Sequence, residues 1–177
     1  MSKEFVKQCF DQLAARESIA VRPSTLTDED LEQFEEAHDV TFPAAYREFL
    51  SVCAYDADLT LSGLLDNFMF EDDAEVTLWL PGQPEGAELS NLAALYENFP
   101  LLLEGGYLPV GRINEDGILC LESETGRVFL ADGEELYDCE SAEDVQDAAI
   151  LLLEDFEPVL KCFFLGEKQN CVDDEDE

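Results

Sequence analysis

Residues 26–50 read LTDEDLEQFEEAHDVTFPAAYREFL, and this stretch predicts two consecutive helices joined by a short linker. Thr27 is placed to cap the first helix, because residues 28–30 are all acidic and the helix dipole favours anions in a first turn. Leu26 and Leu31 flank the cap in the positions of a hydrophobic staple. We therefore expect a helix that begins just after Thr27 and runs to about His38.

The second helix of this stretch is predicted from Pro43 onward. Proline suits the first position of a helix, since it lacks an N–H that would have no partner there. Apolar residues then recur at positions i, i+3, i+4 and i+7, and these are Tyr46, Phe49, Leu50 and Cys53. This spacing places them on one face, which is typical of a helix packed against a core.

Elements on both sides complete an α+β fold. Apolar spacing predicts further helices at 3–16 and 92–99, the latter ended by Pro100, and a strand at 76–80. Short β-prone runs separated by turn sequences predict an antiparallel meander over 107–113, 118–122 and 127–131, with 135–139 as a candidate further strand. Ser141 is expected to cap a long final helix, which Pro158 kinks or splits. We expect a mostly antiparallel sheet of about four to six strands, covered by N-terminal helices and this long C-terminal helix.

The charge of the chain is extreme. Its 177 residues include 9 Lys and Arg against 43 Asp and Glu, a formal net charge of −34, while 46% of the residues are hydrophobic. No Lys or Arg occurs between Arg47 and Arg112, or between Arg127 and Lys161. An anionic surface repels nucleic acid and anionic lipid, and it accelerates encounters with basic partners. The alternative is that the charge serves solubility alone.

The sequence offers little support for catalysis or for a cofactor. His38 is the single histidine, the six cysteines form no CxxC pair, and glycines such as those at 105 and 106 do not make a phosphate-binding motif. With so many carboxylates, a pair suited to hydrolysis could arise by chance, so a carboxylate-based hydrolase stays an open alternative. We expect no metal and no cofactor. Trp79 is expected in the core.

The N-terminus does not resemble a signal peptide, and no apolar run approaches the roughly 18 residues of a membrane span. We therefore expect a cytoplasmic protein with free thiols. The tail at 172–177 is almost wholly acidic, and we expect it to be disordered.

The paired helices resemble the N-terminal signature of the SUKH superfamily, the fold of the Smi/Knr-type fungal cell-wall regulators. That signature is a capped helix with a Phe-Glu-Glu centre, a linker and a Pro-x-x-Tyr-Arg-x-Phe-Leu helix, here residues 34–36 and 43–50. Residues 108–111, 116–121 and 126–129 are similar to the central strands of the family. The family usually has Gly-Asp before the middle strand, where this chain has Asp116-Gly117.

The resemblance implies one SUKH-like domain over 1–171, with a family-like core at 24–165 and a helical extension at 3–16. It also implies frequent service in bacteria as an immunity protein, which binds and neutralises a toxin domain such as a nuclease. No catalytic residue belongs to the family pattern. A regulator or scaffold that binds endogenous proteins through the same fold is the second hypothesis.

The partner-binding face can be predicted only from charge and loop position. We expect an anionic face that mimics nucleic acid and covers the basic active site of a toxin, without nucleic acid or membrane as a partner. The carboxylates assigned to this face are Glu71, Asp72, Asp73, Glu75, Asp116, Asp132, Glu134 and Glu135. Candidate apolar anchors are Phe68, Phe70 and Tyr137, although an aromatic residue is more often part of the core.

Overall fold

A computed structural model describes residues 3–17, 21–23, 27–55, 59–63, 65–66, 74–78, 96–114 and 117–171. Its helices are α1 Lys3–Glu17, α2 Asp28–His38, α3 Ala44–Val52, α5 Pro100–Glu104, α6 Gly133–Asp138, α7 Ala142–Ala148 and α8 Glu157–Phe163. Its strands are β1 Val21–Pro23, β2 Cys53–Tyr55, β3 Leu59–Gly63, β4 Leu65–Asp66, β5 Ala74–Leu78, β6 Tyr107–Ile113, β7 Gly117–Glu122, β8 Val128–Asp132, β9 Ile150–Leu153 and β10 Gln169–Asn170.

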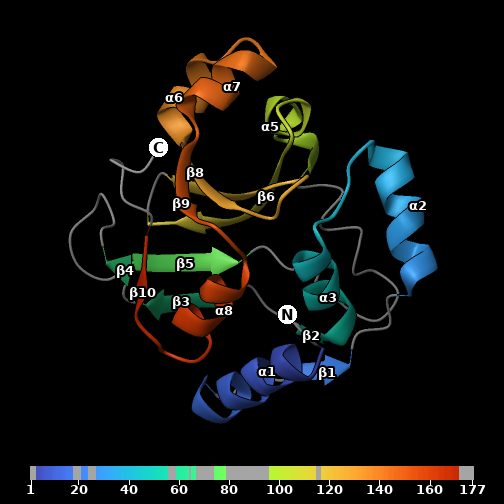
Figure 1. Cartoon of the computed structure of the whole chain (residues 1–177), viewed down its shortest axis with the longest axis vertical. Coiled ribbons are helices and arrows are strands. Elements are labelled where there is room, and N and C mark those ends of the chain that lie inside the picture. The colour runs from blue at the N-terminus through green and yellow to red at the C-terminus, as the bar shows by residue number, and fades with distance from the viewer. Residues whose placement is uncertain are drawn as a thin grey trace.

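A six-stranded antiparallel sheet in the order β3-β5-β6-β7-β8-β9 is the centre of the fold (Figure 1). Strands β1 and β2 form a separate antiparallel pair, and β10 and β4 a short parallel pair. The prediction of an α+β fold with a mostly antiparallel sheet is confirmed.

Side chains of the central strands alternate between two apolar clusters, one on each face of the sheet. On β7, Leu119 and Leu121 belong to the larger cluster, whereas Ile118 and Cys120 belong to the smaller one. The larger cluster takes residues from α1, α2, α3 and α8, and the smaller cluster from α5, α6 and α7. Strands buried on both faces explain why β6, β7 and β8 are apolar at nearly every position.

The capped helix predicted after Thr27 is confirmed, while Leu26 of the predicted staple lies outside the described residues. The Thr27 side chain accepts a hydrogen bond from the backbone N–H of Asp30, and the Asp30 carboxylate accepts one from the N–H of Thr27, which makes a capping box. The left-handed residue Asp39 ends α2. Helix α3 begins at Ala44, one residue after Pro43, and buries Tyr46, Phe49 and Leu50 as predicted. The fourth residue of the predicted stripe, Cys53, begins β2 instead, because α3 ends at Val52.

Helix α1 is integrated into the larger cluster. Its residues Val6, Cys9, Phe10 and Leu13 have no exposed surface. The Phe10 ring stacks on Phe49 of α3 with a centroid distance of 5.4 Å and meets Phe164 edge-on at 5.2 Å. The N-terminal helix therefore closes the core on the α3 and α8 side.

Two sequence predictions in the C-terminal half are wrong. Residues 135–139 do not form a strand. Most of them belong to α6, which covers Gly133–Asp138 and is capped by Asp132. The long final helix is divided into α7 and α8 by β9, whose apolar residues pair with β8 and extend the sheet. The helix predicted over 92–99 is described only from Tyr96: Tyr96 and Glu97 are helical, and the helix ends before Pro100 as predicted. Pro100 then opens α5 as its first residue. Pro158 similarly lies at the start of α8, where its missing N–H costs nothing.

Candidate functional site

Four of the predicted carboxylates gather at one end of the sheet, and we call this group the acidic sheet end: Glu75, Asp132, Glu134 and Glu135. The strand register pairs Val76 with Ile113, Ile113 with Gly117, and Gly117 with Asp132. These four residues therefore form one row across strands β5 to β8 at this end of the sheet. Three strand spacings of about 4.8 Å separate β5 from β8 by roughly 15 Å. Residues distant in sequence are thus brought to one edge of the molecule.

Local hydrogen bonds fix the backbone at this end. The N–H of Asn114, a residue with a positive φ of 55°, donates to the carbonyl of Glu75 at 2.7 Å. The Asn114 Oδ1 accepts from the N–H of Glu75 at 3.2 Å. Asp132 Oδ1 accepts from the N–H groups of Glu134 at 2.8 Å and Glu135 at 3.4 Å, which caps α6. The side chains of Glu75, Glu134 and Glu135 are exposed.

The other predicted site residues lie outside the described part of the chain. These are Glu71, Asp72, Asp73 and Asp116, together with the candidate anchors Phe68 and Phe70 and the predicted core residue Trp79. The third candidate anchor, Tyr137, is described, and its side chain is 90% exposed. The expectation that Tyr137 belongs to the core is therefore wrong.

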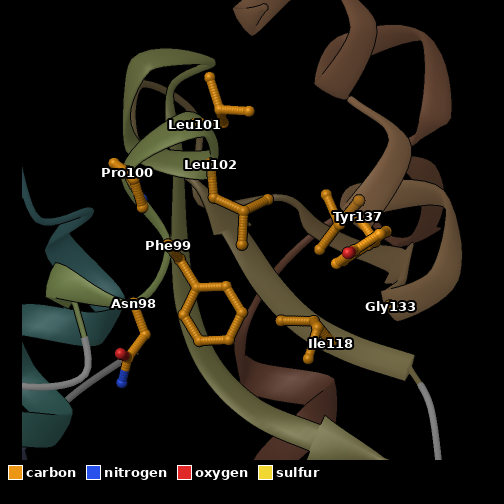
Figure 2. A pocket seen from close by; sticks show the side chains of 9 residues that line it. Asn98, Phe99, Pro100, Leu101, Leu102, Ile118, Gly133 and Tyr137 are labelled. Atoms are coloured by element: carbon orange, nitrogen blue, oxygen red, sulfur yellow. The ribbon is translucent and has the colours of Figure 1, made fainter. Parts of the chain in front are cut away.

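An apolar groove lies beside the acidic sheet end, between α5 and α6, and it has a volume of about 280 Å³. It is lined by Asn98, Phe99, Pro100, Leu101, Leu102, Ile118, Gly133, Leu136 and Tyr137. Figure 2 shows Phe99 and Leu102 on one wall, Tyr137 on the facing wall, and Ile118 of β7 between them. Sequence reasoning did not find this groove.

Both walls of the apolar groove are anchored to the rest of the fold. Leu102 of α5 is buried in the smaller cluster, and Leu136 of α6 packs against that cluster. The side-chain amide of Gln146 on α7 donates to the carbonyl of Gly105 at 3.0 Å, which joins α7 to the end of α5. The groove is therefore formed before any partner arrives.

Two further hollows lie beside α5 and share Asp39, Leu103 and Glu104 in their linings. The larger, about 600 Å³, also carries Glu122 and Glu124. Glu122 is engaged by Arg127, whose Nη2 lies 2.9 Å from its Oε1. The smaller hollow, about 430 Å³, includes His38 and Tyr96. Both hollows carry carboxylates, Asp39 and Glu104 among them, and the larger one is lined mainly by polar groups.

The nucleophilic groups are placed for packing. The His38 ring lies 4.2 Å from the Phe34 ring and 6.3 Å from the Tyr96 ring, between centroids. Burial and the carboxylates of Glu157 and Glu167 raise the pKa of Cys9 to about 12, and burial raises the pKa of Cys120 still further. Both thiols therefore stay protonated at neutral pH, whereas a nucleophilic cysteine needs its thiolate.

The capped α2, the α3 stripe and the six-stranded sheet all lie within one segment that matches a known family. The model of the SMI1 / KNR4 family (SUKH-1) matches residues 25–157, more than half of the chain. The chain belongs to the SUKH-1 family. No curated protein matches it. The SUKH-1 match begins after α1 and ends at the first residue of α8, although both helices contribute to the core.

Within the described part of the chain, none of the helices has the length and apolar character that crossing a membrane requires. Among the residues that the structure describes, no three His, Cys, Asp or Glu side chains are grouped so as to hold a metal ion.

Proposed function

We propose that this SUKH-1 protein is a non-catalytic immunity protein, which binds a basic toxin domain, such as a nuclease, and blocks its active site. The observation that carries the proposal is the acidic sheet end, where Glu75 of β5 lies at the same end of the sheet as the carboxylates of Asp132, Glu134 and Glu135. Membership of the SUKH family supports a protein partner.

The charge distribution supports a basic partner. Strand β5 and the segment from Asp132 to Asp138 lie in the two long stretches that contain no Lys or Arg. Arg112 on β6 is the one cation in the register row next to the sheet end, among the described residues, opposite Thr77 and Ile118. A field of one sign accelerates the encounter with a surface of the opposite sign and disfavours nucleic acid itself.

The non-catalytic part of the proposal is supported by the state of the reactive groups. Cys9 and Cys120 are buried, and their raised pKa values make both thiols poor nucleophiles. An inhibitor that acts by covering a site needs only a complementary surface. We expect its complex with the toxin to be stoichiometric.

The test is to purify the product of the neighbouring open reading frame and to measure binding and inhibition. A tight complex whose association slows as salt rises is the expected result. Neutralising the acidic sheet end with Glu75→Gln, Asp132→Asn, Glu134→Gln and Glu135→Gln should slow association about tenfold or more. Asparagine is chosen at 132 because its side-chain oxygen can still cap α6.

The matched control removes the same charge from exposed positions on α1 and α2. Its substitutions are Glu4→Gln, Asp11→Asn, Glu32→Gln and Glu36→Gln. The control should slow association much less, because charges far from the contact are screened over about 10 Å. Equal slowing by both variants would show that total charge, and not the acidic sheet end, guides the partner. Absence of any complex would contradict the immunity function.

A further inference from the structure

We infer that the apolar groove between α5 and α6 receives a large apolar side chain from a basic segment of the partner, with Tyr137 as the main contact. The inference rests on the proposed function, because it names the chemistry of the surface that the toxin would present. Charge at the acidic sheet end would guide the encounter, and the groove would hold the complex together.

The size of the groove decides what it can take. Pockets that enclose a whole small molecule have volumes of roughly 300–1,000 Å³. The groove, at about 280 Å³, lies just below that range. It is open to the surface between two helices, and its floor and walls are mostly apolar, with Ile118, Leu101 and Leu102 among them. One or two apolar side chains of a protein partner match this space better than a metabolite does.

Tyr137 is the feature that points to a protein partner. Among the described residues it is the one large hydrophobic side chain that is exposed, at 90%. Its helix is held by the Asp132 cap and by Leu136, which packs on the smaller cluster. An exposed aromatic side chain beside an apolar hollow fits the composition of a binding hot spot, in which Tyr is enriched. The aromatic ring contributes contact area, and the hydroxyl stays in water.

The rim of the groove selects a basic occupant. Helix α6 presents the exposed residues Glu134, Glu135 and Asp138, and Glu97 precedes the opposite wall. Both walls lie in stretches without Lys or Arg. An apolar side chain flanked by Lys or Arg would therefore bury its apolar part and pair its charges at the rim. A second copy of this chain is a poor occupant, because two molecules of net charge −34 repel each other.

The first arm of the test uses the toxin complex. Tyr137→Ala should accelerate dissociation of the neighbouring toxin about 30-fold or more, with little change in the association rate. Tyr137→Phe is the matched control, since it keeps the ring, and its dissociation rate should stay within about threefold of the parent protein. Neither change should lower the melting temperature, because the side chain is exposed.

A second arm does not require the toxin. Short synthetic peptides carrying one phenylalanine among lysines and serines are titrated into the labelled protein, and amide shifts are followed by NMR. Shifts should centre on Ile118, Leu136 and Tyr137. They should weaken strongly when the phenylalanine of the peptide is replaced by alanine, or its lysines by glutamates. They should also weaken in Tyr137→Ala.

The two arms separate this inference from the proposed function. If the toxin binds and Tyr137→Ala leaves dissociation unchanged, the groove is not the anchor, and the inference is wrong while the immunity function stands. If no toxin binds, the peptide titration decides. Shifts at the groove that need both phenylalanine and lysine support the inference, and their absence at high peptide concentration overturns it.

Discussion

Glu35 of α2 and Arg47 of α3 form an ion pair across the linker that joins the two helices. One carboxylate oxygen of Glu35 accepts a hydrogen bond from the Arg47 guanidinium, and the other accepts one from the backbone N–H of Phe42 at 3.0 Å. Both side chains are partly buried, with 15% of Glu35 and 28% of Arg47 exposed. One carboxylate thus fixes the entry of the chain into α3.

This arrangement predicts an energetic coupling between Glu35 and Arg47. Glu35→Ala leaves a partly buried guanidinium and a backbone N–H without their partner, so it should lower the free energy of unfolding by about 1–3 kcal/mol. Glu35→Gln should cost less, because its amide oxygen can still accept from Phe42. A double-mutant cycle with Arg47→Ala, measured by urea denaturation, should give a coupling of about 0.5–3 kcal/mol.

The control for this cycle is the more exposed pair of Glu122 and Arg127. The exposed fractions of these side chains are 23% and 41%, so solvent should limit their coupling to at most about 1 kcal/mol. A coupling between Glu35 and Arg47 that is no larger than the control would show that the pair does not hold the linker.

Helix α1 lies outside the segment matched by the SUKH-1 family, yet Phe10 is fully buried between Phe49 and Phe164. Phe10→Ala should therefore lower the free energy of unfolding by about 3–5 kcal/mol, the usual cost of deleting a buried phenyl ring. Gln8→Ala, at an exposed position of the same helix, should change it by less than about 0.5 kcal/mol. Thermal and urea unfolding measure both. If both substitutions changed the free energy of unfolding equally little, α1 would not contribute to the stability of the core.

The sequence predicts well the elements that local chemistry determines. The α2 cap depends on Thr27 and Asp30, three residues apart, and both are visible in the sequence. Strand β6 spans Tyr107–Ile113 as predicted, because a glycine pair and a turn sequence bound its apolar run. In such segments the local preference and the tertiary fold agree.

Elements that depend on distant partners could not be predicted in the same way. The run Ile150–Leu153 has a composition that fits a buried helix or a strand, and only its pairing with β8 makes it β9. The cap at Asp132 could have revealed α6, since Asp followed by acidic residues is a helix start signal. Glu134 and Glu135 follow Asp132 closely in the sequence, so their position beside Asp132 in the structure needs no tertiary information to predict.

The apolar groove could not be predicted from the sequence, and the reason is physical. Its lining comes from residues 98–102, from Ile118 and from residues 133–137, which only the folded sheet brings together. Periodicity identifies which face of a segment is apolar, but not which part of that face remains uncovered. Tyr137 is therefore indistinguishable from a core aromatic until α6 is placed.

Gly117 begins β7 in a position that has no room for a side chain. A Cβ added there would lie 2.6 Å from Leu130 Cδ1 and 2.9 Å from the Ile113 carbonyl oxygen. Gly117→Ala should lower the free energy of unfolding by about 1–3 kcal/mol, since overpacking forces neighbours to shift. Gly105→Ala is the matched control, because its closest contacts would be ordinary ones at 3.4 Å. Circular dichroism during thermal unfolding compares the two, and equal melting temperatures would contradict the close packing at β7.

Tyr46 predicts how stability changes at alkaline pH. The side chain is fully buried, and its hydroxyl has no hydrogen-bond partner among the residues that the structure describes. Burial raises the pKa of Tyr46 above its ordinary value of 10.0. The folded state therefore keeps the proton where the unfolded state releases it. The stability that belongs to this group is complete below about pH 10 and is lost as the pH rises further, by about 1.4 kcal/mol per pH unit.

Tyr46→Phe tests both consequences of that burial. At neutral pH the variant should be more stable than the parent by up to about 1–3 kcal/mol, because an unsatisfied buried hydroxyl is removed. Above pH 10 its free energy of unfolding should fall less steeply, since one proton release on unfolding is lost. Urea denaturation across this pH range measures both effects. Tyr137→Phe removes an exposed hydroxyl and should leave stability at neutral pH unchanged. Destabilisation by Tyr46→Phe would show instead that the hydroxyl has a partner, such as a buried water, that stabilises the packing between α2, α3 and the segment before α5.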